Sequence, residues 1–261
     1  MSFEILIIPN SWFRNPNSDF TNLRYLINKG YDKPVQKYGI IQTKRIISND
    51  SFFENLAVLP NDELNLFLLL GSNEKIEELE KNGVYRDFKN ENIDNAFECD
   101  IPKEFGSLFS LNELSDSRIR IVDEDFKFDD NILKRVLTLF GLRTYNYEVS
   151  NQDEINLNLT TFCSFLYNSA STFFEIIISK CLKNSKIYEE LYHEPLSNYK
   201  SLIIHADCII EHNLIDYYIT KCKFKKSHKA NISIENAGIS YKQIKATKNF
   251  EIGFLYRRIE L

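Results

Sequence analysis

The sequence lacks the features that mark secreted, membrane-spanning or metal-stapled proteins. The five cysteines form no CxxC pair, so neither a zinc-type spacing nor a disulfide framework is indicated. No apolar run reaches the 18 residues that a transmembrane helix needs. The first residues include Glu4 and have no basic segment, unlike a signal peptide. We therefore expect reduced, mostly buried thiols and a cytoplasmic location at rest.

Glycine and proline are scarce, with 8 and 6 residues in a chain of 261, whereas Phe and Tyr number 20 and 14. This balance indicates few sharp bends and many aromatic-rich strands. Hydrophobic residues make up 43% and charged residues 26%, which are ordinary values for a globular protein. A chain of this length can bury roughly three quarters of its unfolded surface, so a core needs no disulfide or metal.

The net charge of -5 argues against a general nucleic-acid binder, which needs a basic face. One local cluster is basic. It comprises Lys221, Lys223, Lys225, Lys226 and Lys229. The pair Arg257 and Arg258 follows near the end of the sequence. Such lysines can protect a strand edge from aggregation. They can also contact anionic lipid headgroups. Charge alone favours the first interpretation.

Hydrophobic periodicity predicts the elements of the first half. A short buried strand opens the chain and stops at Pro9. Further elements follow along the chain: a helix over 19–29 ended by Gly30, a strand over 63–70, a helix over 72–83 capped by Ser72 or Asn73, loops over 84–117, and a helix over 130–141.

Alternating patterns dominate the second half. We expect strands over 143–149 and 154–165, then helices over 171–183 and 185–194. The last sixty residues read as extended segments over 201–211, 214–224, 229–236, 239–247 and 250–261. Short turns between strands favour antiparallel meanders. The predicted fold class is therefore α+β, a large twisted antiparallel sheet with several packed helices.

Candidate catalytic and metal sites are weak. The segment "HADCIIEH" holds His205, Asp207, Cys208, Glu211 and His212, but zinc needs three or four converging ligands and no second cluster repeats the spacing. A nucleophilic Cys208 or Cys181 paired with His193 lacks a local signature. No glycine-rich phosphate loop occurs. The sequence predicts no metal, no cofactor and no enzyme.

The order of elements resembles that of the bacterial gasdermins. The stretch "KANISIENAGISYKQIKATKNFEIGFLYRRIEL" is similar to their closing hairpins, with Gly253 and Phe254 at the core of the last strand motif. Upstream, "LRYLINKGYDKPVQKYGIIQTKRI" resembles their N-terminal helix, with Gly30 and Tyr31 as its Gly-Tyr step.

The resemblance implies a gasdermin N-terminal-domain-like fold over residues 20–261, preceded by an N-terminal extension over residues 1–19. It implies a pore-forming cell-death protein, acting in antiphage defence, that moves to the inner membrane. There it would contact lipids through Lys221, Lys223, Lys225, Lys226, Lys229, Arg257 and Arg258. Homo-oligomers would close into a β-barrel, since lipid requires every backbone group to be paired. A protease or a separate inhibitory partner would control activation.

The alternative is a soluble binding protein, such as an immunity protein that neutralises a toxin. Leakage of dye from anionic liposomes distinguishes the two hypotheses, because only the pore former causes it.

Overall fold

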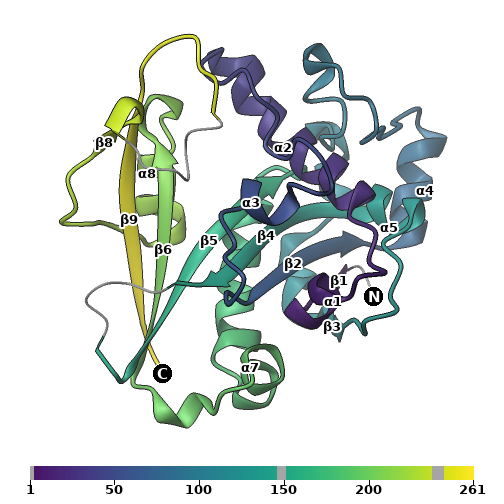
Figure 1. Cartoon of the computed structure of the whole chain (residues 1–261). Coiled ribbons are helices and arrows are strands. Elements are labelled where there is room, and N and C mark those ends of the chain that lie inside the picture. Colours follow the sequence, from purple (N-terminus) through teal and green to yellow (C-terminus); the bar gives the residue numbers. More distant parts are fainter. Residues whose placement is uncertain (1–2, 146–150, 237–243) are drawn as a thin grey trace.

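The computed structural model describes residues 3–145, 151–236 and 244–261 (Figure 1). Its strands are β1 (Phe3–Ile8), β2 (Leu64–Gly71), β3 (Arg118–Ile121), β4 (Val136–Thr144), β5 (Glu154–Ser164), β6 (Ser201–Ile209), β7 (Lys225–Lys226), β8 (Ile232–Ser233) and β9 (Glu251–Glu260). Its α-helices are α1 (Asn10–Arg14), α2 (Thr21–Tyr38), α3 (Phe52–Asn55), α4 (Asn73–Lys81), α5 (Asp130–Arg135), α6 (Ser169–Ile177), α7 (Ser185–Tyr192) and α8 (Ile215–Cys222).

The described strands form one mixed sheet in the order β3-β1-β2-β4-β5-β6-β9-β7, and β8 also pairs with β9. Two neighbouring pairs are parallel, β1 with β3 and β5 with β6. The other pairs are antiparallel. The connection from β5 to β6 passes through α6 and α7, as a parallel pair requires, because only a long crossover can return the chain to the same end of the sheet.

Strands β5 and β6 start side by side and then separate. Their pairing covers only residues 154–158 of β5 and 201–205 of β6, and each strand continues beyond it. Figure 1 shows the result as a V, with its closed end near the C-terminus and its open end towards α2 and α8. We call this divergence of the two strands the β5–β6 cleft, meaning only the gap in strand pairing after Asn158 and His205, not a cavity between side chains.

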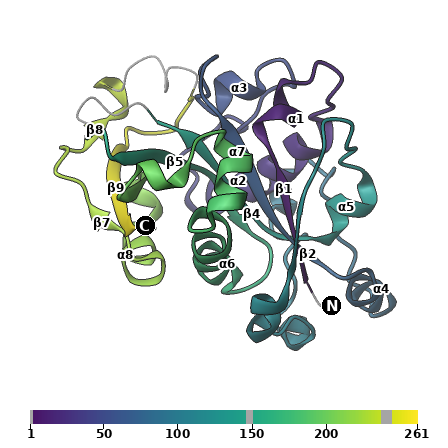
Figure 2. The same cartoon turned by 90° about the horizontal axis from the view of Figure 1, so that it is seen from below.

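Helices cover both faces of the sheet. Figure 2 shows α1 and α3 above the strands and α6 and α8 below them. The core on the first face includes Trp12, Leu23 and Phe52, and the core on the second includes Phe173 and Phe174. Along β2, alternate residues enter the two cores, which is why this strand is buried over its whole length.

Several predicted elements are confirmed. Strand β2 matches the segment 63–70, and α4 matches the predicted polar helix. The Ser72 side chain accepts a hydrogen bond from the Lys75 amide, as an N-cap does. Helix α2 is longer than expected: it passes through Gly30 and ends at Gly39, whose φ is 63°.

Two predicted elements are wrong. The segment 130–141 is a helix only up to Arg135, and strand β4 begins at Val136. The Arg86 guanidinium binds the carbonyls of Lys134 and Val136 at this junction, so a distant side chain stabilises the change of conformation. The segment 214–224, expected to be extended, contains helix α8, whose buried Tyr218 and Cys222 are one turn apart.

The predicted fold class is wrong, and so is the gasdermin-like arrangement. The sheet is mixed, and helices pack on both of its faces. The helices between β5 and β6 create the parallel pair that the prediction of antiparallel meanders missed. The predicted strands 143–149 and 239–247 lie partly outside the described residues. Residues 3–14, expected to belong to an extension, form β1 and α1, and the division at residue 19 itself stays a prediction.

In the described part of the chain, no helix combines the length and the apolar character needed to span a membrane.

Candidate functional site

The β5–β6 cleft begins at Asn158 and His205, the last paired residues of the two strands. Just beyond it, Thr161 has a φ of 52°, a left-handed conformation that is unusual for a β-branched residue. The register between β4 and β5 shifts at the same level, which identifies a β-bulge. Thr161 is fully buried, and its hydroxyl has no hydrogen-bond partner among the described residues. Strain of this kind is often found at functional sites.

Tyr218 of α8 lies in the β5–β6 cleft. Its ring centroid is 5.7 Å from that of Phe162 on β5, and burial first, then the nearby Tyr31 of α2 and Cys208 of β6, act to raise its pKa. The tyrosine is buried, and this burial raises its pKa well above the ordinary value. The hydroxyl therefore stays protonated at neutral pH and can donate a proton.

Helix α2 closes the cleft on the first face of the sheet. The Lys33 ammonium donates to the carbonyl of Ser164, the last residue of β5, at 2.6 Å, and it pairs with Asp100. Burial lowers the pKa of Lys33, while Asp100 opposes that shift. The end of β5 is thus held at a fixed position relative to α2.

Four residues separate the end of β5 from the start of α6, and the N-terminus of α6 has no capping side chain. Asn168 at the N-cap has a φ of 60° and makes no side-chain cap bond, and the first turn holds no acidic residue. A pocket of about 310 Å³ adjoins this point, lined in part by Lys103, Tyr167 and Asn168. A helix N-terminus carries partial positive charge and unpaired N–H groups, so the pocket suits an anionic group.

A polar cluster lies at the closed end of the cleft, formed by Arg143, Tyr145, Asn156, Asn158 and His205. The His205 and Asn156 side chains are hydrogen-bonded, with 2.8 Å between Nε2 and Oδ1. The Tyr145 ring lies 5.0 Å from the His205 ring and 5.5 Å from the Arg143 guanidinium. Burial lowers the pKa of His205 to about 4, so the imidazole is neutral at pH 7.

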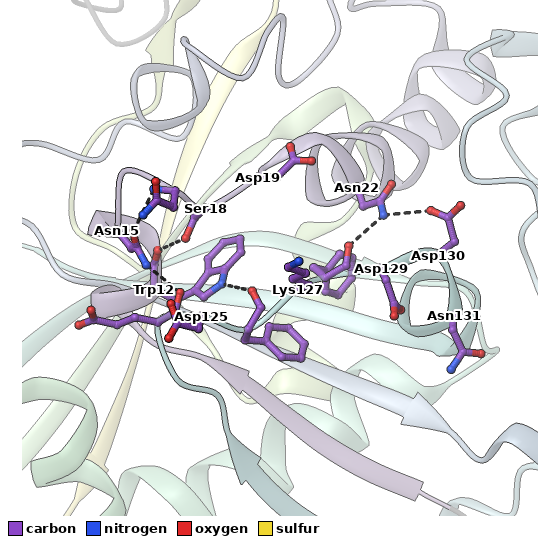
Figure 3. Close-up of a pocket in the computed structure, with 14 residues that line it drawn as sticks. Trp12, Asn15, Ser18, Asp19, Asn22, Asp125, Lys127, Asp129, Asp130 and Asn131 are labelled. Atoms are coloured by element: carbon purple, nitrogen blue, oxygen red, sulfur yellow. Dashed lines mark hydrogen bonds between the residues drawn. The ribbon is translucent and has the colours of Figure 1, made fainter.

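A larger pocket of about 710 Å³ lies elsewhere, between the segment around α1 and residues 124–131. Figure 3 shows hydrogen bonds crossing it: Trp12 Nε1 donates to the Phe126 carbonyl at 2.7 Å, and Asn22 Nδ2 donates to Phe128 and Asp130. These bonds tie the two segments together. We assign this pocket a structural role.

Several of the residues predicted to contact lipid lie near one another: Lys223 and Arg257 pair with the same carboxylate, Glu175, and β7 pairs with β9 at Leu255 and Tyr256. The lysines are exposed: Lys221 lies in α8, Lys223 follows it, Lys225 and Lys226 form the edge strand β7, and Lys229 follows β7. Arg257 is instead largely buried and paired with Glu175, at 2.6 and 3.0 Å. Arg258 pairs with Glu154 and Glu260. Lipid contact, homo-oligomerisation and control by a protease or inhibitor are not tested by these positions and stay predictions.

The glycine motifs have packing roles. Gly30 lies inside α2 against Cys163, and Tyr31 next to it lies below the Arg45 guanidinium. Gly253 of β9 faces Ile210 and Ile215, and Phe254 lies 5.4 Å from the Lys229 ammonium.

The segment "HADCIIEH" does not converge on one point. His205 belongs to the polar cluster, Asp207 is exposed, Glu211 accepts from the Glu251 amide, and His212 stacks on Tyr38. No group of three or more potential metal ligands occurs in the part of the chain that the structure describes. All five cysteines are free and buried.

Sequence reasoning missed the residues of the cleft, Thr161 and Tyr218 among them. The sequence does predict two helices between the strands 154–165 and 201–211. A helical connection of this kind indicates a parallel strand pair, and ligand sites often lie beside such a pair.

Several solved structures to which the chain is similar are acetyltransferases by name. One assigned as a phosphinothricin N-acetyltransferase is 7% identical with a TM-score of 0.40, and each chain is covered over 100%. One assigned as an acetyltransferase of Staphylococcus epidermidis is 12% identical with a TM-score of 0.37 and 98% coverage of both chains. The Microcin C7 self immunity acetyltransferase MccE is 9% identical with a TM-score of 0.26, covering 74% of this chain and 92% of that one.

The prediction that the chain is not an enzyme does not agree with these names, which are those of enzymes. The TM-scores lie below 0.5, so these structures do not establish an activity for this chain. The alternative of an immunity protein is not favoured, because only the name of MccE relates to it.

No curated protein matches the chain. A family model described as sporulation protein RMD6 matches residues 1–259. This match overturns the resemblance to gasdermins, and with it the pore-forming, cell-death and antiphage functions and the active location in the inner membrane. The chain belongs to the RMD6 sporulation protein family.

Proposed function

We propose that the chain is an N-acyltransferase, which moves an acyl group from a thioester of the coenzyme A type to an amine. The observation that supports this most is the β5–β6 cleft, where two parallel strands pair for five residues and then separate around a protonated tyrosine. The reaction class is the one in the names of the similar structures, one of which was solved with acetyl-CoA and AMP.

The cleft suits an extended ligand that carries amide groups. Beyond Asn158, the side of β5 that faces β6 has no paired strand among the described residues. Unpaired N–H and C=O groups on a strand edge bind an extended chain as an added strand would. The bulge at Thr161 changes the direction of these groups at the same place.

The anionic end of such a ligand suits the start of α6. The uncapped N-terminus offers backbone N–H groups, and Lys103 adds a positive charge beside the pocket of about 310 Å³. The residues present therefore fit a diphosphate-bearing thioester.

The thioester, when bound, supplies an activated acyl carbon. The attacking amine forms a bond from nitrogen to this carbon, and the bond from carbon to sulfur breaks. Tyr218 donates its hydroxyl proton to the departing sulfur, the amine gives up a proton to water, and Tyr218 then regains a proton from water. The Tyr218 hydroxyl carries this proton at neutral pH, as an ordinary tyrosine does.

Titration calorimetry with acetyl-CoA and release of free thiol in the presence of amines test this proposal. We expect the unmodified protein to bind acetyl-CoA and to release free thiol from it when an amine is present. Tyr218→Phe should bind acetyl-CoA normally and react about 100-fold more slowly, a usual loss for one proton donor. The neighbouring Tyr217→Phe is the matched control and should keep the rate. Absence of acetyl-CoA binding, or an unchanged rate in Tyr218→Phe, would contradict the proposal.

The family description names sporulation, and we include in the proposal that the reaction serves this process. In the organism that encodes the chain, Tyr218→Phe should lower the yield of spores, whereas Tyr217→Phe should not. Equal spore yields for the two variants would show that sporulation does not depend on the reaction.

A further inference from the structure

Two buried N–H groups lie side by side without an acceptor at the closed end of the β5–β6 cleft. They are Nδ2 of Asn158 and Nε of Arg143, and neither has a hydrogen-bond partner among the described residues. Asn158 is 6% exposed, and the Arg143 side chain is 12% exposed. A buried donor without an acceptor is costly, so such a pair points to a group that supplies acceptor atoms.

The positions of the two residues bring their side chains together. Arg143 of β4 and Asn158 of β5 are direct partners in the antiparallel register, so both side chains project from one face of the sheet. Asn158 is also the last residue of β5 that pairs with β6, opposite His205. The two donors therefore lie at the closed end of the cleft, where the pairing of β5 with β6 stops, on the face of the sheet that α2 covers.

Two buried N–H donors without acceptors favour an anion over a cation at this place. The Arg143 guanidinium contacts Asp62 through Nη1 at 3.2 Å, which leaves Nε directed elsewhere. His205 is neutral at pH 7, since burial lowers its pKa to about 4. Two N–H donors, one of them from a guanidinium, match the two oxygens of a carboxylate.

We infer that Arg143 and Asn158 bind the carboxylate of the acceptor, so that the amine acylated by this protein belongs to a free amino acid. An α-amino acid holds its amine next to its carboxylate, so a carboxylate bound here would place the amine near the closed end of the cleft. This inference rests on the proposed function for the reaction, but the binding of a carboxylate can be measured without it.

The test measures binding in the absence of any acyl donor. The melting temperature is recorded with each of the twenty amino acids, with the corresponding decarboxylated amines, and with the amino-acid amides. We expect at least one amino acid to raise the melting temperature, and its decarboxylated amine and its amide to have little effect. Asn158→Leu should weaken that binding at least tenfold.

The ligand-free proteins provide a readout that separates binding from structure. Asn158→Leu removes an unmet donor at nearly constant volume, so its melting temperature without ligand should equal or exceed that of the unmodified protein. The matched variant is Asn65→Leu, another buried strand asparagine, whose Oδ1 accepts from the Asn10 amide. This variant should melt at a lower temperature, because a bonded group is lost.

Each outcome decides the inference. If the amino-acid amide binds as tightly as the amino acid, the acceptor is a peptide and not a free amino acid. If Asn158→Leu keeps the affinity for the amino acid, Asn158 does not bind its carboxylate. Either result overturns the inference. Amino-acid binding that depends on Asn158, without binding of acetyl-CoA, would support the subsite and contradict the acyltransferase. Acylation of decarboxylated amines at the same rate as amino acids would support the acyltransferase and contradict the carboxylate subsite.

Discussion

Gly30 of α2 packs directly against Cys163 of β5. A Cβ atom at position 30 would lie 2.6 Å from the Cys163 Cβ and still closer to its sulfur. The absence of a side chain at Gly30 therefore sets how near α2 comes to the sheet. The same approach brings Tyr31 and Lys33 to the end of β5, where the cleft opens.

Gly30→Ala should destabilise the protein by about 1–2 kcal/mol. Overpacking in a core costs about 1–3 kcal/mol, and alanine recovers up to about 1 kcal/mol through its helix propensity. Urea denaturation measures the change. The control is Gly106→Ala, since a Cβ at Gly106 meets no heavy atom within 4 Å. Similar unfolding free energies for the two variants would show that the contact with Cys163 is not tight.

Arg86→Leu should be the more damaging of two arginine substitutions. The Arg86 guanidinium donates to the carbonyls of Cys99, Lys134 and Val136, at 2.8, 2.7 and 2.5 Å. Its loss leaves three carbonyls without a donor, at about 1–3 kcal/mol for each one that stays buried. Arg24→Leu, which removes a partly exposed pair with Glu91, should cost no more than about 1 kcal/mol. Equal losses in thermal or urea unfolding would contradict this account of the junction between α5 and β4.

Stability should fall as the pH decreases from 6.5 towards 4. Burial lowers the pKa of His205 from 6.5 to about 4 and also lowers the pKa of His212. The unfolded chain therefore takes up protons first as the pH drops below 6.5, and protonation favours unfolding until the folded protein is protonated too. Above pH 6.5 this contribution to stability is fully present.

Comparison of unfolding free energies at pH 5 and pH 7.5 checks this pH dependence. His205→Gln should reduce the difference by an amount on the order of 1 kcal/mol, a figure discounted because the imidazole is half-buried. His228→Gln is the control, because His228 is exposed, and it should leave the difference unchanged. A pH dependence that survives both His205→Gln and His212→Gln would assign it to other groups.

Strong local patterns predicted their elements correctly. The apolar run of β2 and the cap at Ser72 act within a few residues, so the sequence contains the information that forms them. The helix 130–141 failed because its apolar stripe also fits a buried strand, and the choice depends on pairing with β2 and on Arg86. These contacts join residues far apart in the chain.

The cleft could not be predicted for a related reason. Tyr218 lies on α8, and α8 ends in a left-handed Lys223, at φ 59°, where glycine usually signals the end of a helix. Without that signal, the tyrosines and isoleucines of 214–224 read as a strand. The predicted antiparallel sheet therefore missed that β5 pairs antiparallel with β4 but parallel with β6, and the site depends on this change.

Hydrogen exchange with and without acetyl-CoA tests the central claim most directly, because it reports where the ligand binds. The account predicts slower exchange of the amides at 159–164 on β5 and at 169–172 at the start of α6, with little change in β1 and β2. Protection confined to other segments, or no protection at saturating acetyl-CoA, would contradict the assignment of the β5–β6 cleft as the acyl-donor site.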